Sequence, residues 1–344
     1  MAEDSQANGT EDVVLRRRRA QVLDKLIGEA EPFVQIRDQL SRLSESEATV
    51  LISGETGTGK ELTARALHYL SSKGGFPFVA VNCAALPDTL LEDELFGHER
   101  GAFTDAHAPR PGLLAQAHRG TIFLDEVESL TARAQGALLR VLHDRTFRTL
   151  GSSVERSVDV RFVAATNIDL ASLVQRGLFR ADLFYRLRVL WLELPPLRER
   201  RSDIPLLSGH FLAKHATRTR PAPVLGPAAA NALMEFSWPG NIRELENAIV
   251  RALHLVDGDV IEPHHLGLPA SSASRSSVSG ERLSFKESKR RFVDAFEREY
   301  LARVIAESGG NVTKAALAAR KERRELGKLL KKHGLNAKDF ARLN

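Results

Sequence analysis

Short apolar runs alternate with amphipathic stretches over the first part of the chain. Four runs are apolar at most consecutive positions, namely 49–53, 78–82, 121–125 and 160–166. Consecutive apolar positions are typical of strands that are buried on both faces of a sheet. Between them, stretches such as 60–70 and 132–142 place apolar residues at helical spacing. This regular alternation predicts an α/β fold with a parallel sheet.

The pattern becomes helical after Pro195 and Pro196. Residues 228–236 and 242–255 have the spacing of amphipathic helices, which predicts a smaller helical subdomain. The stretch that follows, 268–281, contains six serines and few apolar side chains, and we interpret it as a flexible linker.

Beyond the linker, aromatic residues recur at helical spacing, and two shorter helices are expected near 312–319 and 322–333. The aromatic stripe is expected to pack in a core or a dimer contact, and it consists of Phe285, Phe292, Phe296 and Tyr300. The pattern divides the chain into a flexible N-terminal segment (1–25), an α/β subdomain (26–200), a helical subdomain (201–267), a linker (268–283) and a helical C-terminal domain (284–344).

Composition narrows the class of protein. A hydrophobic fraction of 43% and a charged fraction of 27% are ordinary for a globular chain. No apolar run reaches the roughly 18 residues of a membrane span, and the polar N-terminus lacks the apolar core of a secretory signal. Cys83 is the single cysteine, so no internal disulfide can form. These features predict a cytoplasmic protein without a membrane partner.

Charge is distributed unevenly along the chain. Residues 284–344 contain 16 Lys and Arg against 8 Asp and Glu, while the rest of the chain carries a net charge of −3. A small basic module on a slightly acidic body is typical of contact with nucleic-acid phosphates. On charge alone, a solvated pair of basic helices is an equally good interpretation.

A glycine-rich segment joins the first apolar run to the helical stretch at 60–70. It reads Gly54, Glu55, Thr56, Gly57, Thr58, Gly59 and Lys60. In this strand–loop–helix setting, glycines let backbone N–H groups turn toward phosphates, and Lys60 reaches the β- and γ-phosphates of ATP. Glu61 departs from the general P-loop motif, which has Ser or Thr there for Mg²⁺.

Two adjacent carboxylates, Asp125 and Glu126, end the apolar run at 121–125. The carboxyl ends of parallel strands form the edge where ligands bind. We therefore expect Asp125 to hold Mg²⁺ and Glu126 to orient and polarise the attacking water. Asn167 ends another run and is a candidate contact for the γ-phosphate or the water, although a strand-ending Thr-Asn pair is more often a turn. Asn82 is similarly weak evidence alone.

A series of motifs resembles the central AAA+ domain of sigma-54-dependent activators, also called bacterial enhancer-binding proteins. The resemblance covers residues ~26–268, with the motifs in family order. They are GETGTGKE (54–61), NCAAL (82–86), ELFGHERGAFTDA (94–106), FLDE (123–126), AATN (164–167), LFRADLFYRL (178–187), LPPLRER (194–200) and WPGNIRELEN (238–247). The fold that this resemblance implies is an AAA+ P-loop ATPase with a helical lid.

The resemblance also implies roles that the residues alone do not give. Glu61 is normal for the family, and Asn82 resembles the switch asparagine that restrains Glu126 until the γ-phosphate is sensed. Arg180 and Arg186 resemble arginine fingers that reach the nucleotide of the neighbouring subunit, which implies a homo-oligomer, from a dimer to a hexameric ring. Without the family, two surface arginines would be the simpler interpretation. Arg243 resembles the lid arginine that contacts the phosphates.

The segment 101–106 resembles the mobile loop through which the family engages sigma-54. Phe103 and Thr104 match the contacting side chains. Asp105 stands where the family usually has glycine, which adopts positive φ angles more readily, and it adds a negative charge. An ordinary surface turn is the alternative interpretation of this segment.

The tail resembles a Fis-type helix-turn-helix. Asn311 is a suitable N-cap, and the candidate DNA contacts are Thr313, Lys314, Arg323, Arg324, Lys328 and Lys331. The match is partial, because Arg320 and Lys321 fill a region that often holds a turn glycine, and Glu322 and Glu325 would repel phosphate unless they face away. A basic helical hairpin with another partner is the alternative.

The function implied is a sigma-54-dependent transcription activator. It would bind upstream DNA sites, hydrolyse ATP in a ring and drive the sigma-54 RNA polymerase holoenzyme from closed to open complexes. The residues ahead of 26 are too few for a receiver domain, so control is expected from expression, a partner or the N-terminal segment. One alternative is a DNA-binding regulator without sigma-54 coupling, which Asp105 permits. The other is an AAA+ remodeller of a different protein.

Overall fold

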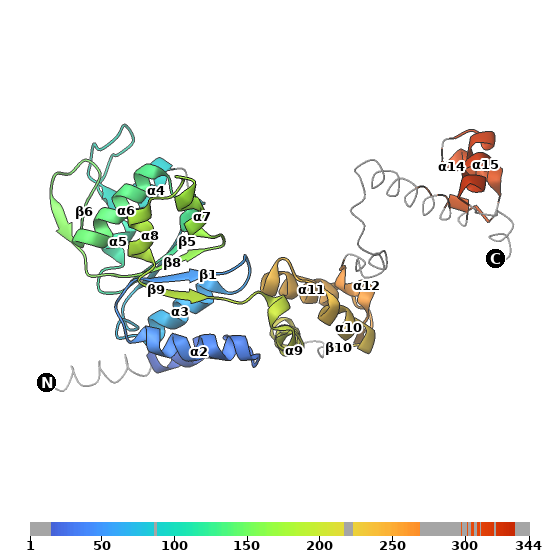
Figure 1. Cartoon of the computed structure of the whole chain (residues 1–344), viewed down its shortest axis with the longest axis horizontal. Helices are drawn as coiled ribbons and strands as arrows, with labels where there is room; N and C mark the ends of the chain where they lie inside the picture. Colours follow the sequence, from blue (N-terminus) through green and yellow to red (C-terminus); the bar gives the residue numbers. More distant parts are fainter. Residues whose placement is uncertain are drawn as a thin grey trace. The chain divides into compact units, whose positions relative to one another are not determined.

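The computed structural model describes residues 15–85, 88–216 and 223–268, together with parts of the tail between 297 and 333. The described tail residues are 297, 301, 304–305, 308–309, 311–319 and 321–333. The chain forms two compact units, residues 1–271 and 272–344, and each is described by itself (Figure 1).

A five-stranded parallel sheet organises the first unit. Its strands are β1 (Val50–Ser53), β2 (Phe78–Asn82), β5 (Thr121–Asp125), β8 (Arg161–Thr166) and β9 (Leu190–Glu193). They lie in the order β2-β5-β8-β1-β9, and every neighbouring pair is parallel. The four strands expected from the sequence are confirmed, two of them starting one residue later than expected, whereas β9 was not predicted.

Consecutive residues of the central strands enter two different cores. Val50 and Ile52 pack on one face of the sheet and Leu51 on the other, because side chains alternate along a strand. Both faces are therefore apolar, which explains the uninterrupted apolar runs. Figure 1 shows α2 and α3 covering one face and the remaining helices the other. The helices are α2 (Glu31–Ser44), α3 (Lys60–Leu70), α4 (Asp88–Phe96), α5 (Leu113–Gln116), α6 (Ala132–Asp144), α7 (Leu170–Gln175) and α8 (Ala181–Leu187).

The end of the predicted N-terminal segment is ordered rather than loose. Residues 15–23 are helical, and Val22 and Leu26 are buried in the core beneath α2 and α3. Arg19 donates from Nε to the carbonyl oxygen of Tyr69 at 2.6 Å. The expectation of a flexible segment is thus wrong for residues 15–25, because apolar side chains there find a core to pack in; residues 1–14 lie outside the description.

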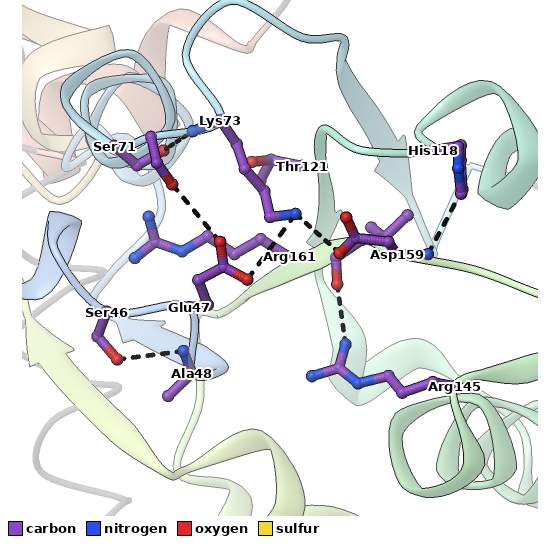
Figure 2. A network of polar contacts seen from close by, with 12 residues as sticks. Ser46, Glu47, Ala48, Ser71, Lys73, His118, Thr121, Arg145, Asp159 and Arg161 are labelled. Carbon is purple, nitrogen blue, oxygen red and sulfur yellow. Dashed lines mark hydrogen bonds and ion pairs between the residues drawn. The ribbon is translucent and has the colours of Figure 1, made fainter.

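Polar side chains tie the helices to the amino edge of the sheet. The buried Arg161 donates from Nη2 to Leu43 O at 2.7 Å and from Nη1 to Leu67 O at 3.3 Å, so that one guanidinium satisfies carbonyls at the ends of two helices. Figure 2 shows Lys73 between Glu47 and Asp159, with Nζ–O distances of 3.8 and 2.8 Å. A ligand would bind at the opposite edge of the sheet, where the parallel strands have their carboxyl ends.

A helical lid follows the sheet. It contains α9 (Ile204–His215), α10 (Pro227–Glu235), α11 (Asn241–Leu255) and α12 (Pro263–Leu266), with a small sheet of β10 (Val224–Leu225) and β11 (Val260–Ile261). Trp238 is fully buried in its core and donates from Nε1 to Leu233 O at 2.8 Å. The two helices expected here from the sequence are confirmed to within a residue at each end.

Two hairpins extend from the α/β core. The first pairs β3 (Gly97–His98) with β4 (Arg110–Pro111), and the second pairs β6 (Thr146–Arg148) with β7 (Glu155–Ser157). Short 3₁₀ turns are η1 (Val127–Ser129), η2 (Leu197–Glu199) and η3 (Arg201–Asp203). The segment predicted to engage sigma-54 is the connection between β3 and β4.

The second unit contains α14 (Val312–Ala318) and α15 (Arg323–Lys332). The N-cap prediction is confirmed, because Asn311 Oδ1 accepts from the backbone N–H groups of Thr313 and Lys314 at 3.0 and 3.2 Å. Residues 269–283 of the linker and the aromatic stripe of Phe285, Phe292, Phe296 and Tyr300 lie outside the described residues. Among the helices that the structure describes, none is long and apolar enough to cross a membrane.

Candidate nucleotide site and output surfaces

The glycine-rich loop connects β1 to α3 at the carboxyl edge of the sheet. Gly57 and Gly59 adopt φ angles of +80° and +101°, which glycine reaches without strain. A Cβ on Gly57 would stand 2.2 Å from Gly240 O of the lid, so no larger residue fits there. The motif is therefore shaped both by its own turn and by the close approach of the lid.

Lys60 begins α3 and is buried inside this loop. Its Nζ donates to the carbonyl oxygens of Gly54 and Glu55 at 2.7 and 3.1 Å. Burial lowers the pKa of Lys60, and the nearby carboxylates, first of all Asp125, oppose that shift. The ammonium is thus bonded to two neutral carbonyl oxygens. A negatively charged phosphate oxygen in their place would bind the ammonium more strongly.

Asp125 and Glu126 stand at the carboxyl end of β5, as the sequence predicted. Burial raises the pKa of Asp125, while Lys60 works against the rise. Glu126 adopts φ +55° and ψ +48°, a left-handed conformation that is costly for a residue with a Cβ. The strained backbone lets the chain turn sharply after the strand, so that two consecutive carboxylates remain at one edge.

A third carboxylate, Glu128, belongs to this edge and was missed by sequence reasoning. Its Oε1 accepts from the backbone N–H of Asn167 at 3.2 Å, which joins the end of β5 to the end of β8. Its Oε2 is buried without a hydrogen-bond partner, and its charge raises the pKa of Asp125. The available signal was its position two residues after Glu126, in the turn that follows the strand.

Asn82 lies opposite Asp125 in the register of β2 and β5. Its Oδ1 accepts from the N–H groups of Ala84 and Ala85 at 2.8 and 3.1 Å, so the side chain caps its own turn. Within the described residues no hydrogen bond joins Asn82 to Glu126. The restraint implied by the family resemblance is not formed in this conformation.

The lid is fastened to the glycine-rich loop by contacts that the sequence did not reveal. Asn241 is fully buried, and its Nδ2 donates to Thr56 O at 3.0 Å while its Oδ1 accepts from Leu197 N at 2.7 Å. Arg198 pairs with both carboxylate oxygens of Glu55 at 2.7 Å, and this contact lowers the pKa of Glu55. The glycine-rich loop and the lid segment are therefore joined by direct hydrogen bonds.

Two cavities flank the glycine-rich loop. A cavity of about 590 Å³ has Gly54, Glu55 and Asn167 on its walls. The other, of about 390 Å³, is lined by Thr56 of the loop and Arg243 of α11. The predicted lid arginine thus stands beside the glycine-rich loop, as its assigned role requires.

Arg180 precedes the first residue of α8, and Arg186 lies in its last turn. Arg180 pairs with Asp182 at 2.7 Å, and Arg186 Nε donates to Leu142 O at 3.4 Å. Both line a surface groove of about 710 Å³ that also contains Tyr185, whose side chain is 72% exposed. Neither arginine lines the two cavities beside the glycine-rich loop of its own chain.

The connection between β3 and β4 is a compact turn with an exposed tip. Gly101 N donates to Ala106 O at 2.8 Å, and Phe103 and Thr104 are exposed between them. Asp105 is also exposed, and it is not among the described residues with positive φ. The backbone of this turn therefore does not require the glycine that the family usually has at that position.

The predicted DNA contacts lie on the surface of the second unit. Leu326 and Leu330 of α15 are buried in one cluster with Ala315 of α14 and with Leu301, Val304 and Ile305. The six residues Thr313, Lys314, Arg323, Arg324, Lys328 and Lys331 are all exposed. On a helix, 324, 328 and 331 share the face opposite 326 and 330, so the basic side chains lie on the exposed face of α15.

Residues 26–193 match the model of the sigma-54 interaction domain, and residues 198–282 match the AAA+ ATPase lid domain. The chain is 44% identical to the regulatory protein AtoC of Escherichia coli strain K12, covering 89% of this chain and 67% of that protein. It is 42% identical to the transcriptional regulatory protein GlrR of the same strain, covering 90% and 68%.

The chain belongs to the sigma-54-dependent activators.

Solved structures agree with this assignment. The crystal structure of NtrX from Brucella abortus is 34% identical and superposes with a TM-score of 0.69, covering 93% of this chain and 71% of that one. NtrX has also been solved in complex with ADP and with ATP. As a member of the family, the chain has the AAA+ P-loop fold with a helical lid, binds nucleotide and is an ATPase. It spans about two thirds of the length of AtoC and GlrR.

Proposed function

We propose that this activator binds upstream DNA and uses ATP hydrolysis in a ring oligomer to convert sigma-54 RNA polymerase closed complexes into open ones. The observation that carries the proposal is the match of residues 26–193 to the sigma-54 interaction domain, because the β3–β4 connection lies inside it. The alternative is a DNA-binding regulator without sigma-54 coupling.

In the nucleotide site, the glycine-rich loop and Lys60 hold the phosphates, and Arg243 contacts them from the lid. Mg²⁺ prefers oxygen ligands, and the half-buried Asp125 offers a carboxylate beside the place where the phosphates lie. Bound there, the ion would neutralise charge on the phosphoryl oxygens. Glu126 polarises the attacking water, and Asn167 senses the γ-phosphate through a strand end that Glu128 holds in place.

Arg180 and Arg186 serve the nucleotide of a neighbouring subunit. Support comes from their position on a groove that is separate from the two cavities beside the loop, neither of which they line. A guanidinium inserted from a neighbour neutralises charge that develops on the transferring phosphoryl group. The site is therefore complete only in an oligomer, and a closed ring gives every subunit such a neighbour.

The exposed tip of the β3–β4 connection, Phe103 and Thr104, engages sigma-54. The φ angle of Asp105 is not positive, so aspartate in place of the usual glycine does not strain the turn. This conformation supports the proposed role. Asp105 still adds one negative charge at the contact surface. Coupling to sigma-54 is accordingly favoured over the uncoupled alternative, and it is directly testable.

A trapping experiment tests the coupling. With purified sigma-54 and ADP plus aluminium fluoride, the protein should form a complex on a native gel that is absent with ADP alone. Thr104→Ala should keep ATPase activity within about twofold and fail to form the complex, because only the output contact is removed. Ser202→Ala, which deletes an exposed hydroxyl in η3, serves as the matched control. Failure of the unmodified protein to form the complex, with ATPase intact, would favour the uncoupled regulator.

The second unit binds DNA through the basic face of α15. Replacing both Arg324 and Lys328 with alanine should weaken binding to a mixed-sequence DNA duplex and lower the salt slope by about one for each phosphate that is no longer neutralised. Fluorescence anisotropy at several salt concentrations measures both quantities. The control is Arg37→Ala, which removes an exposed charge from α2 of the other unit. Equal salt slopes for all three proteins would assign this face to a partner other than nucleic acid.

A further inference from the structure

A buried histidine stands at the base of the β3–β4 connection. His98 is 9% exposed and ends β3, the strand from which the turn departs. Its Nδ1 lies 2.6 Å from Asp93 Oδ1, and its Nε2 lies 3.0 Å from the carbonyl oxygen of Ala108, which precedes β4 on the returning side of the turn. One side chain therefore joins helix α4 to the far stem of the turn.

The two partners hold this ring from both sides. A carbonyl oxygen only accepts hydrogen bonds, so Nε2 donates to Ala108 O when this contact is formed. Nδ1 and Asp93 Oδ1 share a second, short hydrogen bond, and the side chains of both residues are about one-tenth exposed. A buried side chain with both of its polar atoms hydrogen-bonded is held in one orientation.

The same ring also contacts the tip of the turn. The rings of His98 and Phe103 meet edge to face, with centroids 4.9 Å apart and planes at 67°. Phe103 is left 44% exposed, so about half of the side chain is covered by the domain. Backbone hydrogen bonds from Gly101 N to Ala106 O and from Ala106 N to Phe103 O close the turn above the ring.

Helix α4 connects this contact to the nucleotide edge of the sheet. It begins six residues after Asn82, which ends β2 beside Asp125, and it passes Asp93 before the chain reaches His98. Neighbouring charges on the helix have their own partners: Glu92 pairs with Arg133 and Glu94 with Arg110, each at 2.8 Å. Asp93 is thus the acidic residue of α4 that faces the histidine.

We propose that His98 is a positioning residue that latches the sigma-54 contact against the domain and links it to α4. While both hydrogen bonds of His98 and its ring contact persist, Phe103 and the segment at Ala108 are held against the domain. Binding of Phe103 to sigma-54 requires that these contacts of His98 break. A shift of α4 would pull on Asp93 and so reach the turn through His98. This inference rests on the proposed role of the turn in sigma-54 contact.

Limited proteolysis of the full chain tests the latch independently of sigma-54. Trypsin can cleave after the exposed Arg100 only when the turn opens locally. His98→Phe keeps an aromatic ring against Phe103 but removes both hydrogen bonds, and it should raise the cleavage rate at Arg100 roughly tenfold or more. Cleavage after Arg176, an exposed site in the turn following α7, is the internal reference and should not change.

Two further variants separate the latch from a folding defect. Asp93→Asn can still bond to Nδ1 of a neutral ring whose Nε2–H donates to Ala108, so its cleavage rate should stay near that of the unmodified protein. The double variant with His98→Phe and Asp93→Leu leaves no unpaired buried charge, and it should open as readily as His98→Phe alone. An unchanged rate at Arg100 in a folded double variant would overturn the proposal.

The functional readout is the nucleotide dependence of sigma-54 trapping. With the latch removed, complex formation should no longer require aluminium fluoride and should appear with ADP alone, while ATPase turnover changes less than about twofold. A variant that opens at Arg100 yet still requires the analogue would refute the latch. If the unmodified protein forms no complex at all, the proposed function fails, whereas the proteolysis result still decides whether His98 holds the turn.

Discussion

Replacing Glu126 with alanine is expected to leave ATP binding intact and to lower ATP turnover by at least about 10²-fold. The carboxylate is the proposed acceptor that polarises the attacking water, whereas the glycine-rich loop and Lys60 are the proposed binding groups for the phosphates. Binding is measured with a fluorescent ATP analogue and turnover by phosphate release. Turnover within a few-fold of the unmodified protein would remove Glu126 from the catalytic set.

The backbone of Glu126 supplies an independent control. Its left-handed conformation costs a non-glycine residue roughly 1–2 kcal/mol, and only glycine avoids that cost. Glu126→Gly should be as inactive as Glu126→Ala but should unfold about 2–4 °C higher than the alanine variant, because the strain is relieved. Thermal denaturation of both variants without nucleotide makes the comparison. Equal midpoints would mean that the turn relaxes away from the left-handed region when the carboxylate is removed.

Much of the α/β fold could be predicted because its core strands are buried on both faces. Residues such as Val50, Leu51 and Ile52 leave no polar interruption, and the glycine-rich loop follows directly. Strand β9 was not predicted, although Leu190, Trp191 and Leu192 form a short apolar run that ends at Glu193. So short a run does not by itself distinguish a strand from part of a helix. Its place at the sheet edge is not the reason, because β2 lies at the other edge and was predicted.

The nucleotide site could be predicted only as far as its local motifs reach. Lys60 and Asp125 are recognisable by their spacing, but the lid contacts depend on residues far apart in the chain. Asn241 meets Thr56 across 185 positions, and Arg198 meets Glu55 across 143. No periodicity encodes such pairs. The roles proposed for Arg180 and Arg186 require a second subunit, so only the family resemblance suggested them.

Geometry adds detail that the family resemblance does not supply at two positions. Asp105 stands where the family usually has glycine, yet it is not among the described residues with positive φ, whereas Gly101 of the same turn has φ +82°. Asn82 resembles the switch asparagine, and in this structure its oxygen accepts from N–H groups of its own turn. A motif specifies residue types and not the conformation that the backbone adopts.

Arg186→Ala is expected to bind ATP normally and to lower turnover by about 10³-fold or more, the usual contribution of an arginine finger. The same decrease would follow from a finger that acts within its own subunit, so the variant alone cannot locate the site of action. Arg180→Ala is the matched comparison, because both arginines lie on the same groove and Arg180 is paired with Asp182. A decrease confined to one of them would identify which guanidinium reaches the nucleotide.

Mixing two inactive variants separates action within a subunit from action between subunits. Arg186→Ala subunits retain Glu126, and Glu126→Ala subunits retain Arg186. In a randomly mixed ring, roughly one interface in four combines an intact Glu126 with an intact arginine from its neighbour. Mixed in equal amounts, the two proteins should therefore recover up to about a quarter of normal turnover, although each is inactive alone. If the arginine acted within its own subunit, every site in the mixture would lack one of the two groups, and no activity would return.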